Sequence, residues 1–398
     1  MLPNFHQRYR NIEMQVASYR PAIRYRQYLL FLSAGLLISF QSLAVNFSSN
    51  IHIGFDDNPH SLSEPRNPLS DKYFHGDVKL SSDFKSPILF KLRLRKSEYV
   101  DDDRASWSKT YAELGYKSKF KSGRKTWRYR FSVDAAKNDK TYVSKSTGLI
   151  GSFGGFSIAD RYDSKLTNFN AEVSFRNRQK TKYSFGFQHR NKDYEDFSIA
   201  GLSDLDYRHN RLKFEINNRL SDTARLVFGL SFTAREYLDR RADDLAGNDI
   251  AGTDLELDYR SYKLSYIHRV AKKIKWTYSV GIAERNDNSS GYQDSDNIYA
   301  SISGRYRLEN DRQLKLSLRY SDADYPNQLT TTTALGDEDD REKNGYKVNL
   351  EYQQLLNKGV SFSSHYFVEL NFADFDSPNP DYIYQRSALA AGFRWKSL

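Results

Sequence analysis

Basic residues recur in groups at alternate positions along this chain of 398 residues, and rows of that kind could bind or conduct anions. In an extended chain, alternate side chains point to the same side, so each group presents its charges together. Rows of arginine and lysine make a water-filled pore selective for anions. The groups are Lys91, Arg93 and Arg95; Arg128 and Arg130; Arg211 and Lys213; Arg305 and Arg307; and Lys315 and Arg319.

The residues that alternate with these cations are apolar. In segment 88–96, isoleucine, phenylalanine and two leucines occupy the even positions, while lysine and two arginines occupy odd positions. This period of two predicts a β-strand with one apolar and one charged face. Segment 297–320 shows the pattern on both sides of the turn-forming residues Glu309, Asn310 and Asp311, and so predicts a hairpin.

Sixteen segments with this alternation follow one another from Val45 onward. Each is about 9 to 11 residues long, which suffices for a tilted strand to cross a bilayer. Their connections alternate between short turns and longer loops, with loops predicted at 138–163 and 321–343, and both ends of the array fall on the short-turn side. An outer-membrane barrel requires this alternation, whereas a soluble sandwich has no reason to sort its loops by side.

The composition agrees with strands that are apolar on one side only. Hydrophobic residues make up 39% of the chain and aromatic residues 15%, and the mean hydropathy is -0.74. We therefore predict an all-β fold, a transmembrane antiparallel up-and-down β-barrel of about 16 strands, with 14 as the alternative and both termini periplasmic. The competing interpretation is a secreted all-β sandwich.

Residues 1–44 have the features of a secretory signal peptide. Five arginines precede the apolar run 28–40, and Ser42-Leu43-Ala44 places small residues at the positions that determine cleavage. A run of about 13 apolar residues is too short to cross a bilayer as a helix. We expect cleavage after Ala44 and a barrel domain at 45–398, with Met14 as an alternative start.

If the apolar face of each strand meets lipid, the charged face lines the interior. Charges sort there because a charge facing lipid at the midplane costs about 2 to 4 kcal/mol. Basic residues outnumber acidic ones on this face, so we expect an anion-selective lumen. The alternative is that these cations pair with lumenal carboxylates and stiffen the wall. The apolar, glycine-rich part 148–159 of one long loop is the candidate for an inward-folded constriction, an exposed loop being the alternative.

Three histidines, His52, His75 and His365, share the expected inner face, on strands that become near neighbours when the barrel closes. A hydrolase would need a serine or carboxylate oriented beside one of them, and no local motif announces this. We therefore expect a protein that is not an enzyme, with no cofactor and no bound metal. An outer-membrane hydrolase is kept as a second alternative function.

Segment 50–80 resembles the opening of outer-membrane β-barrel porins. Their first hairpin often carries a hydrophobic-Asp-Asn stretch, here Phe55-Asp56-Asp57-Asn58, and then a loop ending in Ser-Asp, here Ser70-Asp71. Some of these barrels are associated with exopolysaccharide export. The resemblance implies a porin of the general or the exopolysaccharide-associated type in the cell outer membrane of a Gram-negative organism.

With the basic inner face, the resemblance favours a passive outer-membrane channel for anionic small solutes or an acidic polysaccharide. The first alternative is an accessory barrel for the assembly or secretion of surface proteins or lipoproteins. Expected partners are outer-membrane lipid and lipopolysaccharide, and the barrel-assembly machinery during insertion, while a homo-oligomer is left open. Nucleic acid is not expected, because the basic residues sort by strand face instead of forming a patch or tail.

Overall fold

The computed structural model describes residues 45–63, 68–82, 86–123, 125–177, 180–271, 273–331 and 338–397. The predicted signal peptide, residues 1–44, lies outside the described residues. Within those ranges, no helix combines the length and the apolar character needed to cross a membrane.

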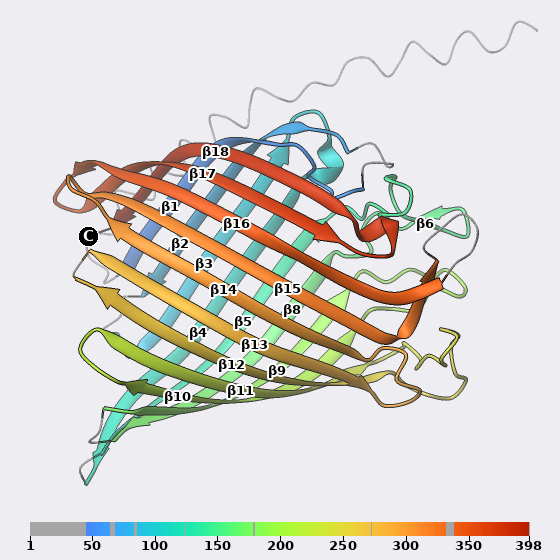
Figure 1. Ribbon diagram of the computed structural model, residues 1–398, viewed down its shortest axis with the longest axis horizontal. Coiled ribbons are helices and arrows are strands. Elements are labelled where there is room, and N and C mark those ends of the chain that lie inside the picture. The colour runs from blue at the N-terminus through green and yellow to red at the C-terminus, as the bar shows by residue number, and fades with distance from the viewer. Residues whose placement is uncertain are drawn as a thin grey trace, which may run out of the picture. The chain divides into compact units, whose positions relative to one another are not determined.

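Sixteen antiparallel strands form one closed barrel (Figure 1). Each strand pairs with its neighbours in sequence, and the last pairs with the first, so the sheet has no free edge. This closing contact, the seam, joins β1 and β18 from Ser48 opposite Lys396 to Asp56 opposite Ala388. The predicted all-β, up-and-down barrel is confirmed, with sixteen strands and not fourteen.

The strands are as follows. The barrel consists of β1 (Val45–Asp56), β2 (Asp71–Ser82), β3 (Ile88–Tyr99), β4 (Trp107–Ser122), β5 (Lys125–Lys140), β8 (Ser164–Arg176), β9 (Lys182–Tyr194), β10 (Tyr207–Arg219), β11 (Ala224–Tyr237), β12 (Glu256–Val270), β13 (Ile274–Asp287), β14 (Ser295–Arg307), β15 (Arg312–Thr331), β16 (Glu338–Lys358), β17 (Phe362–Asp376) and β18 (Tyr384–Ser397). Outside it are a hairpin of β6 (Ser152–Phe153) and β7 (Phe156–Ser157) and the 3-10 turns η2 (Asp103–Ala105) and η3 (Pro380–Tyr382).

Short turns join the strands at one end of the barrel, and longer loops join them at the other (Figure 1). The turn between β14 and β15 contains Asn310 and Asp311, with positive φ values of 56° and 53°. Two consecutive left-handed residues give a type I′ turn, whose twist matches that of the flanking strands. Asparagine and aspartate tolerate this conformation, so the predicted turn needs no glycine.

The strands β15 and β16 continue well past their predicted ends. Both extend into segment 321–343, where the sequence predicts a loop, and that prediction is wrong. The register shifts between Tyr325 and Leu329, and Pro326, which has no N–H to donate, lies in this irregular part. Beyond the lipid a strand no longer needs an apolar face, so the periodic signal ends before the hydrogen bonding does.

The distribution of side chains is inverted relative to a soluble protein. Apolar side chains point outward along the strands and are exposed, as with Ile53 at 58%, Leu114 at 64% and Ile298 at 59%. The inner face instead buries polar groups, among them Glu113 and Asp134. This arrangement excludes a sandwich of two sheets packed through apolar side chains.

A band of aromatic side chains covers the outer face near the short turns. Trp127 lies between Phe120 and Phe175, with ring centroids 6.2 and 4.6 Å away, and Phe175 continues to Tyr183 at 5.1 Å. Aromatic girdles mark the level of the lipid headgroups in membrane barrels. The apolar zone of this barrel therefore ends close to its short turns.

Candidate functional site

The residues predicted to line a pore lie on the inner face of the barrel wall. On each strand they alternate with apolar or aromatic side chains that are exposed on the outer face, and several of them line cavities inside the barrel. Side chains one position apart point to opposite faces of a sheet, so the charged residues must point inward where their apolar neighbours are exposed on the outer face. The exposed neighbours are Leu94, Phe131, Leu212, Tyr306 and Leu318.

Part of these cations is neutralised by carboxylates on neighbouring strands. Such pairs lie on β2–β5 and β15–β18, the strands on both sides of the seam. They cross-link strands that are adjacent or, for Arg394 and Glu351, two apart, as the alternative interpretation of the basic face expects. The pairs are Arg93 with Asp77, Arg130 with Glu113, and Lys315 and Arg394 with Glu351.

The seam has an ion pair of its own. Asp56 is 1% exposed and accepts hydrogen bonds from Nε of Arg386 at 3.0 Å and from its Nη2. The hydroxyl of Tyr99 donates to the same carboxylate at 2.9 Å. The bidentate contact fixes β1 against β18. Asp56 belongs to the porin-like stretch 55–58, so this part of the motif serves barrel closure.

A different arrangement covers the inner face of β10–β14, where cations meet neutral acceptors and aromatic rings. Arg211 donates through Nε to the hydroxyl of Thr233 at 2.8 Å. The guanidinium of Arg235 lies 4.4 Å from the ring centroid of Tyr207, within the range of a cation–π contact. Arg319 on β15 lies 4.7 Å from a tyrosine ring of β14. None of these three arginines forms an ion pair with a described carboxylate.

The remaining predicted residues also lack carboxylate partners. Lys91 Nζ lies 4.4 Å from the ring centroid of Tyr111, and Arg95 lies 5.8 Å from that of Trp107. The four predicted residues named at the end of this paragraph are exposed, and no carboxylate in the described ranges pairs with them. Charges that face water without counter-ions attract anions. The four residues are Arg128, Lys213, Arg305 and Arg307.

Two cavities open along the inner wall. The larger, about 560 Å³, lies where β1–β4 face β15–β18 and includes Tyr73, Arg319 and Arg386 in its lining. The smaller, about 380 Å³, lies against β3–β10 and is lined by Glu113 and Lys213 among others. Charged side chains therefore border the hollow part of the barrel on both sides.

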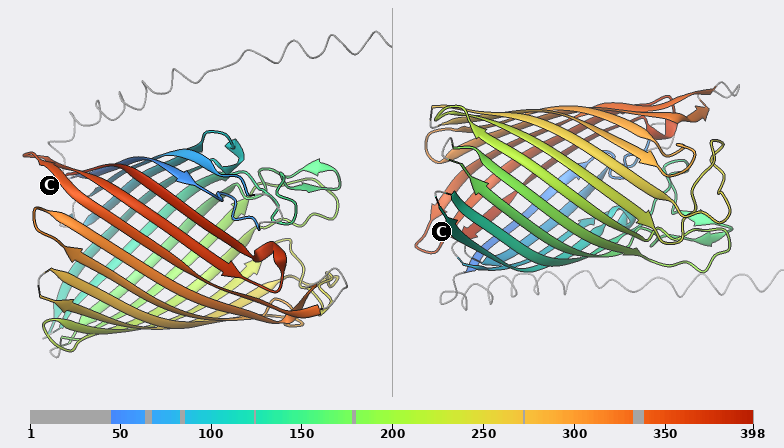
Figure 2. Two further views of the ribbon diagram at one scale, coloured as in Figure 1. Left: turned by 45° about the horizontal axis from the view of Figure 1, so that its top comes forward. Right: turned by 90° about the horizontal axis from the view of Figure 1, so that it is seen from below.

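The loop 141–163 after β5, the mouth loop, reaches across the long-loop end of the barrel. Lys145 Nζ lies 5.1 Å from the ring centroid of Tyr384 on β18, and the carbonyl of Gly148 accepts a hydrogen bond from Arg104 at 3.5 Å. Much of the predicted constriction, 148–159, instead forms the β6–β7 hairpin, which projects beyond the barrel end (Figures 1 and 2). The contacts to the far wall come from the residues before the hairpin.

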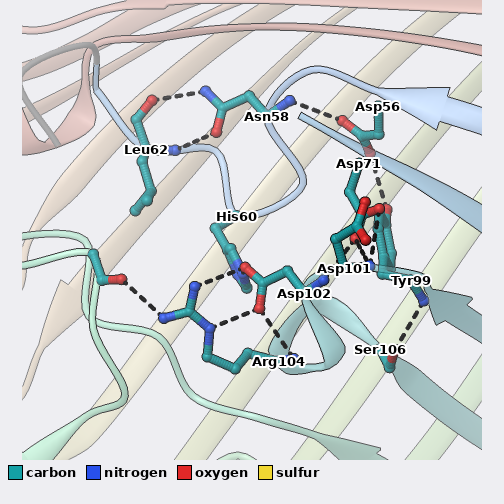
Figure 3. Close-up of polar contacts among 11 residues, drawn as sticks. Asp56, Asn58, His60, Leu62, Asp71, Tyr99, Asp101, Asp102, Arg104 and Ser106 are labelled. Atoms are coloured by element: carbon teal, nitrogen blue, oxygen red, sulfur yellow. Dashed lines mark hydrogen bonds and ion pairs between the residues drawn. The ribbon is translucent and has the colours of Figure 1, made fainter. Parts of the chain in front are cut away.

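A buried polar cluster connects three loops at the same end (Figure 3). His60 Nε2 lies 2.9 Å from Oδ2 of Asp102, and Arg104 donates to both oxygens of Asp102 at 2.6 and 2.8 Å. The side chains of His60 and Asp102 are 8% and 6% exposed. The loop after β1 is thereby tied to η2, and through Arg104 to the mouth loop.

The ionisation of this cluster follows from its contacts. The hydrogen bond from Arg104 lowers the pKa of Asp102 to about 2. Burial lowers the pKa of His60 below its usual value, against the opposing effect of the hydrogen bond and charge of Asp102. The folded loops therefore favour a neutral histidine and an ionised aspartate.

The histidines considered from the sequence meet only in part. His52 and His75 stack with ring centroids 4.6 Å apart, as expected for adjacent strands. In the described ranges no serine or carboxylate side chain hydrogen-bonds the rings of His52, His75 or His365. His60 does have a carboxylate partner, Asp102, although no sequence feature of its loop predicts this contact. No described serine bonds the His60 ring.

Two residues of the inner face are important and were not singled out from the sequence. Arg190 and His209 pair in register on β9 and β10. A signal for Arg190 exists, because it continues the alternation of Ser184 and Gln188 against Phe185 and Phe187. The same signal exists for His209, because it shares the parity of Arg211 and Lys213 on β10.

A closed sixteen-stranded barrel with an apolar exterior and a charged interior defines a transmembrane β-barrel of the outer-membrane type. The chain is an outer-membrane protein with the architecture of a porin.

No protein-family model matches the chain, and no curated protein matches it. Among solved structures it is similar to an anion-selective porin from Comamonas acidovorans, at 11% identity over 88% of this chain and 98% of that one, with a TM-score of 0.41. It is also similar to OccAB3 from Acinetobacter baumannii, at 11% identity over 88% and 99%, with a TM-score of 0.45. A third is OmpT, an outer membrane protein of Vibrio cholerae, at 9% identity over 88% and 97%, with a TM-score of 0.42. Similarities this low carry no inference about function.

Proposed function

We propose that the barrel is a passive outer-membrane channel for anionic small solutes or an acidic polysaccharide. The observation that carries the proposal is a set of inner-face cations on β10–β15 that have no carboxylate partner among the described residues. Cations in a low-dielectric wall raise the local concentration of anions and repel cations. These cations are Arg211, Lys213, Arg305, Arg307 and Arg319.

The ion pairs near the seam support the proposal in a second way. Three inner-face carboxylates, Asp77, Glu113 and Glu351, each already bond an arginine or lysine. These three therefore contribute little free negative charge to the lumen. In the proposed orientation the short turns and both termini face the periplasm and the long loops face outward, as in known outer-membrane barrels.

Reversal potentials in planar bilayers under a potassium chloride gradient test the proposal. We expect the wild-type channel to prefer chloride over potassium, and the double variant Arg211→Gln/Lys213→Gln to lose much of that preference. The matched control is Arg93→Gln/Asp77→Asn, which also changes two inner-face residues but removes an ion pair and leaves the net charge unchanged. A wild-type preference for potassium would contradict the proposal.

Liposome swelling tests whether small anionic solutes are preferred over neutral ones. Vesicles containing the protein should swell in solutions of glucuronate faster than in solutions of neutral glucose, because the two solutes have similar size and differ in charge. Failure of the folded protein to admit either sugar, together with the absence of conductance, would reject the channel in favour of an accessory barrel.

A further inference from the structure

A buried histidine without a hydrogen-bond partner lies on the inner face of β10. His209 is 1% exposed, and neither of its ring nitrogens has a partner in the described part of the chain. Burying such a group unbonded is unfavourable unless another molecule bonds it. His209 pairs in register with Arg190 on β9 and with Arg235 on β11, so an arginine flanks it on each side.

More cations gather at the same place. Arg211 lies two residues along β10 on the same face, and the charges of Arg190, Arg211 and Arg235 all act on the His209 ring. Lys192 occupies the next inner position of β9. The Nε of Arg235 is also buried without a partner. Four basic side chains and one histidine therefore share three adjacent strands, β9, β10 and β11 (Figure 1).

Each of the four cations is oriented by a neutral oxygen, and none pairs with a carboxylate of the described residues. A guanidinium has five N–H donors, so one such contact fixes its position and leaves other donors available. The contacts are Arg190 Nε to Asn168 Oδ1 at 2.7 Å, Lys192 Nζ to the Tyr194 hydroxyl at 2.6 Å, Arg211 Nε to the Thr233 hydroxyl at 2.8 Å, and Arg235 Nη1 to the Tyr237 hydroxyl at 3.2 Å.

A nearby carboxylate is occupied by amides. Asp134 on β5 accepts hydrogen bonds from Asn168 at 2.5 Å and from Asn170 at 2.7 Å. Asn168 in turn accepts from Arg190, so it stands between the acid and the arginine. Asp134 therefore does not form an ion pair with the cluster on β9–β11.

We propose that this β9–β11 cluster, made of Arg190, Lys192, His209, Arg211 and Arg235, is a phosphate-binding site in the lumen wall. Like charges held together repel one another, and a bound dianion removes that repulsion. A phosphate group carries a charge of about -1.5 to -2 and at least three acceptor oxygens, so it uses more of these donors than a carboxylate can. A water molecule would satisfy His209 but would leave the four charges unbalanced. The inference deepens the proposed function and rests on it for the entry of the solute into the lumen.

Isothermal titration calorimetry on the full-length protein, folded in detergent micelles at constant ionic strength, tests the site. We expect inorganic phosphate to bind saturably at one site per barrel, and acetate to bind at least about tenfold more weakly. A hexose monophosphate forms a second arm. If the hexose monophosphate and inorganic phosphate each bind in separate titrations, the site accepts phosphate esters. If only inorganic phosphate binds, the site is limited to the free ion.

Variants locate the binding. Arg211→Gln and, independently, Arg190→Gln should each weaken phosphate binding at least about tenfold, because each removes one charged donor. The control Arg130→Gln/Glu113→Gln removes an ion pair from the same lumen and should bind as the wild type does. Heat-modifiable migration in gels shows which variants are folded barrels. If one of the two single variants does not fold, the other still tests the site.

Three results would overturn the site: no saturable phosphate binding by the folded wild type, equal weakening in the control, or acetate binding as tight as phosphate binding. Chloride-selective conductance without phosphate binding would reject the site and leave the channel proposal standing. Phosphate binding without anion-selective conductance would reject the channel and support the site.

Discussion

The ammonium group of Lys145 lies 5.1 Å from the ring centroid of Tyr384, although four barrel strands separate the elements to which the two residues belong. Lys145 lies in the mouth loop after β5, and Tyr384 begins β18. Because β1, β2, β3 and β4 lie between β5 and β18 in the closed sheet, the contact requires the loop to extend over the opening. The base of the mouth loop, and not its apolar tip, therefore makes this contact with the far side of the opening.

Shortening the mouth loop should widen the channel. We expect replacement of residues 143–158 by a short glycine linker to raise the single-channel conductance in planar bilayers, because Lys145 and its neighbours then no longer extend over the opening. Removal of the hairpin tip alone, residues 152–157, should leave the conductance unchanged, because the tip lies beyond the barrel end. The reverse pattern would assign the constriction to the hairpin.

Breaking the buried ion pair at the seam should destabilise the barrel. Asp56→Asn leaves Arg386, whose side chain is 35% exposed, without its counter-charge, and we expect the free energy of unfolding to fall by about 1 to 3 kcal/mol in urea titrations. The control is Glu98→Gln, which breaks the exposed pair with Lys96, and should cost at most about 1 kcal/mol. Similar losses in the two variants would show that Asp56 does not hold the seam.

Acidification should loosen the loops at the long-loop end. The folded pKa of His60 is lower than its unfolded value of 6.5, so below that pH the unfolded loop binds a proton that the folded loop does not. The contribution of His60 to stability therefore falls as the pH drops from 6.5 through its folded pKa. The lowered pKa of Asp102 acts in the same direction, at pH values below 3.8.

Hydrogen exchange of residues 57–63 at pH 7.5 and pH 5 measures this effect. We expect their protection to fall at pH 5 in the wild type. In His60→Gln, which has no titratable group at this position, protection should not change between the two pH values. Equal losses in the two proteins would show that another group controls the loops.

Substitution by alanine should have opposite effects on stability at two glycines, Gly392 of β18 and Gly76 of β2. A Cβ on Gly392 would lie 2.2 Å from the carbonyl oxygen of Ile51, so we expect Gly392→Ala to cost about 1 to 3 kcal/mol of unfolding free energy. A Cβ on Gly76 of β2 would meet nothing within 4 Å, and Gly76→Ala should stabilise by about 0.5 to 1 kcal/mol. Urea titrations of both variants test this, and a stabilising Gly392→Ala would contradict the close approach of the strands.

The barrel could be predicted from sequence because lipid on one face of each strand and water on the other require apolar and polar residues to alternate. The alternation in segment 297–320 and its turn at Asn310 and Asp311 appear in the structure as expected. The outer parts of β15 and β16 could not be predicted, because strands beyond the lipid need no apolar face. Their backbone hydrogen bonds alone continue the sheet.

The division of the cations into paired and unpaired groups was not predictable. Arg93 and Arg211 look alike in sequence, because each lies at an inner position of an alternating segment and is followed by an outward-facing leucine, Leu94 or Leu212. Their difference comes from the strand alongside, which presents Asp77 to the first and Thr233 to the second. Which residues meet depends on the register between strands, and the alternation of side chains does not fix that register.

In the closed order of strands, β11 with its unpaired Arg235 lies halfway round from β1, whose Asp56 binds Arg386. The electrical field inside the barrel consequently has a component across the passage as well as along it. A zwitterion such as an amino acid would turn its carboxylate toward β11 and its ammonium group toward the opposite side.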